Sequence, residues 1–292
     1  MSALGDLVAL LDLEPIEVNV FRGRSPDDER QRVFGGQVAG QALVAAGRTV
    51  EPDRTVHSLH AYFLRPGDPS VPILYDVDRI RDGRSFATRR VVAVQHGEAI
   101  FNLAASFHRA EEGFDHQLPM PDAPPPERLP TFAERLVPYR EQVGEWYTRP
   151  QPIDLRHVSD PPHVSGGRAT RPPRQQVWFR ADGTLPDDPL LHACVVTYAS
   201  DMTLLDSILL AHGTSWLDPS LMGASLDHAM WFHRPFRADE WLLYDQESAS
   251  ASGARGLGQG RIYRRDGVHA VSVVQEGLFR RRRPPSGEHD AV

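Results

Sequence analysis

The sequence predicts an α+β fold made of two tandem copies of one unit, each with a helix packed against an antiparallel sheet. Residues 58–66 (SLHAYFLRP) return as residues 225–235 (SLDHAMWFHRP), 167 positions later and with two added residues. Gly83-Arg84 before one β-rich run matches Ala254-Arg255 before another, at an offset of 171. Two matches in the same order and at nearly one offset indicate an internal repeat. The length of 292 residues agrees with two domains of ordinary size.

In the first unit, a short amphipathic helix is expected at 4–11, where leucine and valine recur on one stripe. Residues 15–21 alternate between apolar and polar side chains, which predicts a strand. Gly35-Gly36 precedes a helix at 37–46 that is rich in alanine, valine and leucine. Because this helix is apolar on all sides, we expect a sheet to wrap around it. The strands of that sheet are expected at 55–64, 71–80, 86–96 and 99–108, with a turn at His96-Gly97.

The second unit repeats this pattern from Gln175 onward. We expect a strand at 175–181 and then a long apolar helix at about 190–211. Alternating stretches predict strands near 224–233, 240–250, 256–265 and 268–279, with a turn at Asp266-Gly267.

A proline-rich stretch separates the two units. More than half of the 25 prolines of the chain fall between residues 113 and 174. Proline fixes φ and removes a backbone donor, so the Pro-Pro segments of this stretch are not central strands. We therefore expect an N-terminal domain at 1–112, a linker over the surface at 113–174, a C-terminal domain at 175–282 and a disordered tail at 283–292.

Composition excludes several classes of function. The 39 acidic residues outnumber the 32 basic ones, which leaves no basic footprint for nucleic acid. No apolar run approaches the roughly 20 residues of a membrane-spanning helix. The single cysteine, Cys194, rules out an internal disulfide and indicates a cytoplasmic protein. All basic residues are arginine, so chemistry that needs a lysine amine is excluded.

Asp201 is a carboxylate within an apolar stretch (VVTYASDMTLL). If the helix is continuous here, spacings of three and seven place Asp201 on one face with Leu204 and Ile208. A carboxylate on such a face needs partners, because burying an unpaired charge is costly. Alternatively, Ser200 or Asp201 caps a helix that starts at Met202. The sequence leaves both interpretations open.

Gln275 and Ser225 are two further polar residues in strands of the second unit. Alternation places Gln275 on the face of Val271 and Val273, with Glu276 on the other face. Because a charge costs more to bury than an amide, we expect Gln275 to point inward. There it either offers a donor and an acceptor to a site or is satisfied by backbone groups alone. Ser225 opens its strand, where a small hydroxyl residue is common.

The first copy lacks these polar groups. At the repeat offset, Gln275 corresponds to Ala105, and Asp201 falls near residues 33–38, which contain no carboxylate. We therefore expect one site per chain, formed by the second copy.

Other motifs fail on geometry. Residues 83–87 (GRSFA) resemble a nucleophile elbow, but the predicted turn precedes a strand and not a helix. Residues 256–260 (GLGQG) lack the spacing of a dinucleotide-binding fingerprint. The histidine pairs His57/His60 and His228/His233 have odd spacings that place their members on opposite strand faces, so no metal site is predicted. We expect neither a metal nor a cofactor.

Five separated motifs together resemble the type II acyl-CoA thioesterases, over residues 5 to 282. They are VFGGQVAGQAL (33–43), HSLHAYFLRP (57–66), YASD (198–201), DHAMWFHRP (227–235) and VQEG (274–277). The resemblance implies a double hotdog fold, in which each half wraps an antiparallel sheet around a central helix. It also implies an acyl-CoA substrate, and it suggests a homo-oligomer.

The resemblance also implies a catalytic site. The family's aspartate matches Asp201, its glutamine matches Gln275, and its threonine falls on Ser225. Serine keeps the hydroxyl but loses the β-branch that restricts χ1. Water held by these residues would attack the thioester with Asp201 as general base, and direct attack by Asp201 through an anhydride stays open.

Further residues are expected to bind the substrate or its oxyanion. Backbone N–H groups at Gly35 and Gly36 are the candidate oxyanion donors, and Gln37 and His60 are further candidates for binding the oxyanion or the substrate. Two other functions stay open at this stage. A hydratase or dehydratase on this fold would pair the carboxylate with His60 or His228, and a non-catalytic acyl-CoA-binding protein would need only the binding tunnel.

Overall fold

The first unit is an antiparallel sheet around a central helix, in a computed structural model that describes residues 2–26, 31–144, 148–162 and 170–281. Its elements are α1 (Ala3–Leu11), β1 (Glu14–Glu17), β2 (Val20–Gly23), α2 (Gly35–Gly47), β3 (Arg54–Phe63), β4 (Ile73–Asp82), β5 (Phe86–Gln95) and β6 (Glu98–Arg109). The two predicted helices and the four long strands are confirmed to within about three residues. The turn at His96-Gly97 has positive φ at both residues, as a tight hairpin between twisted strands requires.

The strand predicted at 15–21 is wrong. The chain turns at Val18-Asn19 and folds back as the β1–β2 hairpin. Asn19 has φ 67°, a left-handed conformation that asparagine adopts more readily than most residues. Ile16 and Val18 are 48% and 71% exposed, so their alternation does not mark a buried face.

The second unit repeats the first with two interruptions. Its elements are β8 (Arg174–Ala181), α6 (Pro189–Ser200), α7 (Asp206–Ala211), β9 (Leu221–Ser225), β10 (Asp227–Phe232), β11 (Leu242–Ser252), β12 (Arg255–Arg264) and β13 (His269–Arg281). The helix predicted at 190–211 is interrupted after Ser200 and resumes at Asp206. The strand predicted at 224–233 is divided at Leu226. Both interruptions lie beside the candidate site.

The proline-rich stretch contains its own secondary structure. It forms η1 (Pro126–Arg128), α3 (Phe132–Leu136), η2 (Val137–Tyr139), α4 (Arg140–Val143) and the edge strand β7 (Ile153–His157), which pairs with β8. Trp178, Trp241 and Tyr263 pack together beneath Met120 and other residues of this stretch. The stretch therefore covers part of the second unit's sheet as well as joining the units. The tail predicted at 283–292 lies outside the described residues.

The two units share one sheet. Its strand order is β1-β2-β4-β5-β6-β3-β10-β13-β12-β11-β8-β7, with β9 paired to β13 off this path. The β3–β10 pair joins the two halves, and there Ala229 lies opposite His60. The separation of these two residues, 229 − 60 = 169, equals that of the matching Arg65 and Arg234, 234 − 65 = 169. The pairing is therefore centred on equivalent residues, as expected for two copies related by an approximate twofold axis.

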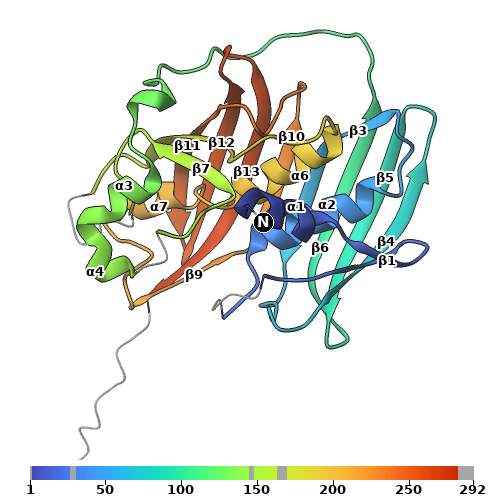
Figure 1. Cartoon of the computed structure of the whole chain (residues 1–292), viewed down its shortest axis with the longest axis horizontal. Helices are drawn as coiled ribbons and strands as arrows, with labels where there is room; N and C mark the ends of the chain where they lie inside the picture. The colour runs from blue at the N-terminus through green and yellow to red at the C-terminus, as the bar shows by residue number, and fades with distance from the viewer. Residues whose placement is uncertain (1, 27–30, 145–147, 163–169, 282–292) are drawn as a thin grey trace, which may run out of the picture.

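The two central helices lie side by side within the curved sheet (Figure 1). A β-carbon added to Gly36 would overlap the carbonyl oxygen of Tyr198, and one added to Gly47 would lie 2.5 Å from the Leu190 side chain. The start of α2 therefore meets the end of α6, so the helices are antiparallel. This double hotdog arrangement is the one that the family resemblance implies, and it places Asp201 at the start of α2.

Candidate active site

Three side chains from separate elements meet just beyond the end of α6. The Oδ1 atom of Asp201 accepts hydrogen bonds from Gln275 Nε2 at 2.5 Å and from Ser225 Oγ at 3.1 Å. Gln275 Nε2 also donates to Ser225 Oγ at 2.9 Å. The structure thus brings together the three residues that the resemblance assigns to catalysis.

Two of these side chains, Asp201 and Ser225, lie where a helix or a strand is interrupted. Asp201 is the C-cap of α6, with φ −82° and ψ −6°. It caps no following helix, because the N-cap of α7 is Leu205 and α7 has no side-chain cap. Neither interpretation drawn from the sequence is therefore correct: the helix is broken, and Asp201 is released from the helical stripe to face the sheet. Ser225 ends β9 immediately before the division at Leu226.

Burial perturbs the acidity of Asp201. The residue is partly exposed, but protein atoms enclose its carboxyl group, and burial raises its pKa to about 6. Hydrogen bonds from Gln275, Ser225 and the backbone N–H of Gly36 act in the opposite direction. The carboxylate is therefore ionised at neutral pH and basic enough to accept a proton.

The start of α2 forms the opposite wall of the site. A β-carbon added to Gly35 would lie 2.7 Å from Asp201 Oδ2 and 2.8 Å from the Phe63 ring, so only glycine fits there without movement of its neighbours. The Gly36 N–H is engaged by Asp201. The backbone N–H of Gln37 bonds to the Phe34 carbonyl oxygen at 3.1 Å, so the binding role predicted for Gln37 gains no support from this N–H group and stays a prediction. Its amide donates at 3.1 Å to both the carbonyl oxygen of Arg24 and the Ser25 hydroxyl.

Comparisons with known proteins identify the family of the chain. Residues 151–278 match the model of the acyl-CoA thioesterase family, and residues 25–108 match the model of the acyl-CoA thioesterase N-terminal domain. Acyl-coenzyme A thioesterase 8 of Mus musculus is 45% identical, over 94% of this chain and 88% of the mouse protein. This chain belongs to the acyl-CoA thioesterase family.

Solved structures agree with this assignment. Acyl-CoA thioesterase II TesB2 from Mycobacterium marinum is 49% identical, covers 97% of this chain and 100% of its own, and gives a TM-score of 0.78. A protein with hot dog fold from Alicyclobacillus acidocaldarius gives a TM-score of 0.75 at 17% identity, over 96% of this chain and 98% of its own, which supports the fold alone. In the described part of this thioesterase family member, no helix is both long and apolar enough to cross a membrane.

His60 lies outside the Asp201 cluster of this thioesterase. Its side chain is exposed and lies edge-on to Trp231, with ring centroids 5.2 Å apart. Its neighbours Leu59 and Ala61 are buried, so alternation along β3 sends His60 to the outer face of the sheet. Phe63 is the β3 side chain that reaches the start of α2, next to Asp201. His60 therefore lies apart from the Asp201 cluster, and its role in substrate binding stays a prediction.

His228 points inward and lies beside Gln275. Burial lowers the pKa of His228 to about 4, and the nearby Gln275 side chain offsets part of that effect. The imidazole is therefore neutral at physiological pH, and its Nε2 atom lies 2.8 Å from Ser200 Oγ. With His60 outside the Asp201 cluster, the geometry does not favour the hydratase alternative, which needs a histidine that exchanges protons with the substrate.

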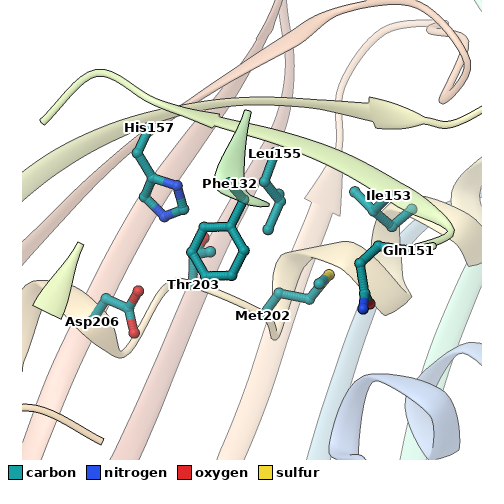
Figure 2. A pocket seen from close by; sticks show the side chains of 8 residues that line it. All are labelled: Phe132, Gln151, Ile153, Leu155, His157, Met202, Thr203 and Asp206. Atoms are coloured by element: carbon teal, nitrogen blue, oxygen red, sulfur yellow. The ribbon is translucent and has the colours of Figure 1, made fainter. Parts of the chain in front are cut away.

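Sequence reasoning missed a second buried carboxyl, Asp206. It lines a cavity of about 130 Å³ (Figure 2) together with Phe132, Gln151, Ile153, Leu155, His157, Met202 and Thr203. Asp206 Oδ1 accepts a hydrogen bond from Trp216 Nε1 at 2.6 Å, and burial raises the Asp206 pKa to about 7. Its place in the apolar stretch LLDSILL was the available signal, of the same kind that identified Asp201. Among the described residues, no group of three or more metal-ligating side chains is present.

Proposed function

We propose that this chain hydrolyses fatty acyl-CoA to a free fatty acid and coenzyme A. The observation that supports this function most strongly is the single hydrogen-bonded cluster of Asp201, Ser225 and Gln275. The cluster joins an ionised carboxylate, a hydroxyl and an amide at a partly exposed position in a chain of this family. These are the groups needed to hold one water molecule and remove its proton.

The proposed reaction begins with a water molecule bound beside Asp201. Asp201 takes a proton from this water as its oxygen attacks the thioester carbonyl carbon, and the C–S bond then breaks to release the coenzyme A thiolate. Gln275 fixes both Asp201 and Ser225, so the two groups that contact the water keep one geometry. Positioned proton transfer of this kind contributes about 10² to 10⁴ in rate.

The oxyanion is expected to form at the start of α2. In its first turn, the N–H groups of Gln37 and Val38 bond to the Phe34 carbonyl, and that of Gly36 engages Asp201. Gly35 is therefore our preferred N–H donor, supported by the positive end of the helix dipole. Gly36 contributes to catalysis indirectly, because its N–H group holds Asp201, the general base.

The cavity beside Asp206 is a candidate for part of the acyl chain. Met202, directly after Asp201, forms one end of it with Ile153, whereas Asp206 and His157 lie at the other end (Figure 2). Its volume is close to that of an engineered cavity of about 150 Å³ that takes up benzene, so it has room for a few methylene groups. Replacing Ile153 with tryptophan is expected to shift the preference toward shorter acyl groups, measured as relative kcat/KM over a chain-length series.

Thiol release distinguishes this function from its alternatives. Purified protein is incubated with a long-chain acyl-CoA, and free thiol is followed with a chromogenic thiol reagent. Hydrolysis gives one thiol per substrate consumed. Loss of enoyl-CoA absorbance without thiol would instead identify a hydratase, and binding without turnover would identify a non-catalytic acyl-CoA-binding protein.

We further propose that the enzyme acts in the cytoplasm as a homo-oligomer. The single cysteine is buried and free, as in proteins of reducing compartments. Tyr62 and Leu64 are 59% and 46% exposed close to the β3–β10 junction, which supports contact between copies there. Light scattering coupled to size-exclusion chromatography measures the oligomeric state, and a mass of one chain at all concentrations would refute association.

A further inference from the structure

His228 and Gln275 form a buried polar pair directly across two strands. Ala229 pairs with Val274 and Met230 with Val273, so the next position of this antiparallel ladder sets His228 opposite Gln275. Side chains at opposite positions have β-carbons about 4.5–5.5 Å apart. His228 is 1% exposed and Gln275 is 0% exposed, so both side chains enter the protein interior.

The fold itself does not need a polar pair at this position. In the first unit, β3 and β6 make the corresponding pair from Leu59 and Ala105, which are 0% and 1% exposed. An apolar pair therefore fills the same place in the copy that has no catalytic groups. The histidine and the amide occur together only in the copy that contains Asp201.

Two buried atoms of this pair lack a regular hydrogen bond within the described structure, namely His228 Nδ1 and Gln275 Oε1. On the other side of the imidazole, Nε2 lies 2.8 Å from Ser200 Oγ, which is also 3.0 Å from the carbonyl oxygen of Thr197. The Ser200 hydroxyl has one proton, which it donates either to Nε2 or away from it, to the Thr197 carbonyl oxygen or to the weaker acceptor Met230 Sδ at 3.6 Å. The acceptor that receives this proton determines which nitrogen of the neutral His228 ring is protonated.

Only one direction of the Ser200 hydrogen bond gives both His228 Nδ1 and Gln275 Oε1 a hydrogen-bond partner. If Ser200 donates away from Nε2, then His228 carries its proton on Nε2, and two buried acceptors, Nδ1 and Gln275 Oε1, face each other. If Ser200 donates to Nε2, then Nδ1 carries the proton and donates to Gln275 Oε1. A buried polar atom without a partner loses its hydrogen bond to water and gains none in return, which favours the second arrangement.

We propose that His228, as its Nδ1–H tautomer held by Ser200, is a positioning residue that fixes the orientation of the Gln275 amide. Both amide N–H groups then face the catalytic side, one toward Asp201 and one toward Ser225. A flipped amide would turn its carbonyl oxygen toward the Asp201 carboxylate and lose both donations. This role rests on the proposed hydrolytic function, but the tautomer is a property of the resting protein.

Two isosteric variants separate positioning from simple packing. The amide nitrogen of asparagine overlaps Nδ1 of histidine, whereas that of glutamine overlaps Nε2. We expect His228→Asn to keep most of kcat and His228→Gln to lose about tenfold or more in kcat, with KM changed less than twofold. Because the Gln275 hydrogen bond lowers the Asp201 pKa, His228→Gln should also shift the acidic limb of the kcat pH profile upward. His212→Gln, at an exposed position, is the matched control.

Nitrogen-15 NMR of the imidazole, assigned with the His228 variants, tests the tautomer without substrate. Protonated Nδ1 and unprotonated Nε2 are expected. The opposite tautomer, or a His228→Gln enzyme with wild-type kcat and pH profile, would overturn the proposal. Equal losses of kcat in both variants that follow their thermal unfolding temperatures would reduce His228 to a packing residue. A wild-type protein that releases no thiol would refute the hydrolytic function, and the NMR result would still decide the tautomer.

Discussion

Burial and hydrogen bonding act on the Asp201 carboxyl in opposite directions. Burial raises its pKa, whereas Gln275, Ser225 and the Gly36 N–H stabilise its charge and leave the pKa at about 6. A carboxylate with an ordinary pKa near 4 would be a weaker base, and one raised above 8 would be protonated at neutral pH. The hydrogen bonds therefore keep the group charged, and burial makes it more basic.

Asp201→Asn tests this carboxylate directly. Asparagine preserves the shape of the side chain but does not accept a proton from water. We expect kcat to fall about a hundredfold or more, because positioned proton transfer contributes about 10² to 10⁴ in rate. Steady-state thiol release measures the effect, and circular dichroism checks the fold. Full activity in a folded Asp201→Asn protein would place the base elsewhere.

The pH dependence of the reaction should report the same group. Asp201 accepts a proton only when ionised, so kcat/KM is expected to rise with pH up to about 6 and then to level off. Below that point it should fall about tenfold per pH unit. A flat profile between pH 5 and 8 would contradict the assignment of Asp201 as the base.

Secondary structure was predictable where the burial of apolar side chains alone determines it. The apolar helix at 37–46 and the four long strands of the first unit follow from periodicity, because burial of one face or of all faces dominates there. The break after Ser200 was not predictable, since the apolar residues continue across it. Tertiary contacts of Asp201 with β9, β13 and α2 stabilise that break, and these contacts are far apart in the sequence.

Part of the site could also be predicted from the periodicity of apolar residues. Asp201 and Gln275 were identifiable as polar residues where the pattern requires apolar ones, and the family resemblance added Ser225. The motif that contains His60 did not indicate that this side chain lies apart from the Asp201 cluster, because a motif fixes sequence position but not the face of the strand, which the buried residues Leu59 and Ala61 determine here. Which backbone N–H of α2 is free could not be predicted, because that depends on bonds made after folding.

The contact between the start of α2 and Asp201 gives a prediction at the scale of helices. In Gly35→Ala, the new β-carbon would lie 2.7 Å from Asp201 Oδ2 and 2.8 Å from the Phe63 ring, so the carboxylate has to move. We expect kcat to fall about tenfold or more, although alanine is intrinsically the better helix former. Gly113→Ala is the control, because nothing lies within 4 Å of its added β-carbon. Wild-type kcat in Gly35→Ala would show that Asp201 tolerates displacement.

Duplication followed by divergence accounts for the presence of the Asp201 cluster in the second unit, without an equivalent among the described residues of the first. The approximate twofold axis relates the Asp201 end of α6 to the Gly47 end of α2, and not to residues 33–38 as the repeat offset predicted, because Asp201 and Arg48 are the C-caps of the two equivalent helices. At the Gly47 end, Leu190 packs against the glycine. At that second position the first unit has Ala105 in place of Gln275 and Leu59 in place of His228. The first unit therefore stabilises the shared sheet, and its α2 contributes the wall that faces Asp201. Both halves therefore contribute residues to the candidate site.

Asp206 makes the stability of the whole molecule depend on pH. Its folded pKa of about 7 exceeds the ordinary value of 3.8, so the folded state retains a proton that the unfolded state loses. Between pH 4 and 7 the folded protein binds more protons, and its free energy of unfolding therefore falls as pH rises. A shift of about three pKa units corresponds to at most about 4 kcal/mol, reached above pH 7.

Asp206→Asn should remove this dependence. Asparagine still accepts the Trp216 hydrogen bond through its carbonyl oxygen, but it has no proton to lose. We expect the stability of the variant relative to the wild type to increase by about 2–3 kcal/mol between pH 5 and pH 8, measured by urea unfolding at each pH. Asp76→Asn, on an exposed face of β4, controls for the loss of one negative charge. If the relative stability of the Asp206→Asn protein does not increase between pH 5 and pH 8, the buried carboxyl is stabilised as the anion, and the cavity beside it holds a compensating donor.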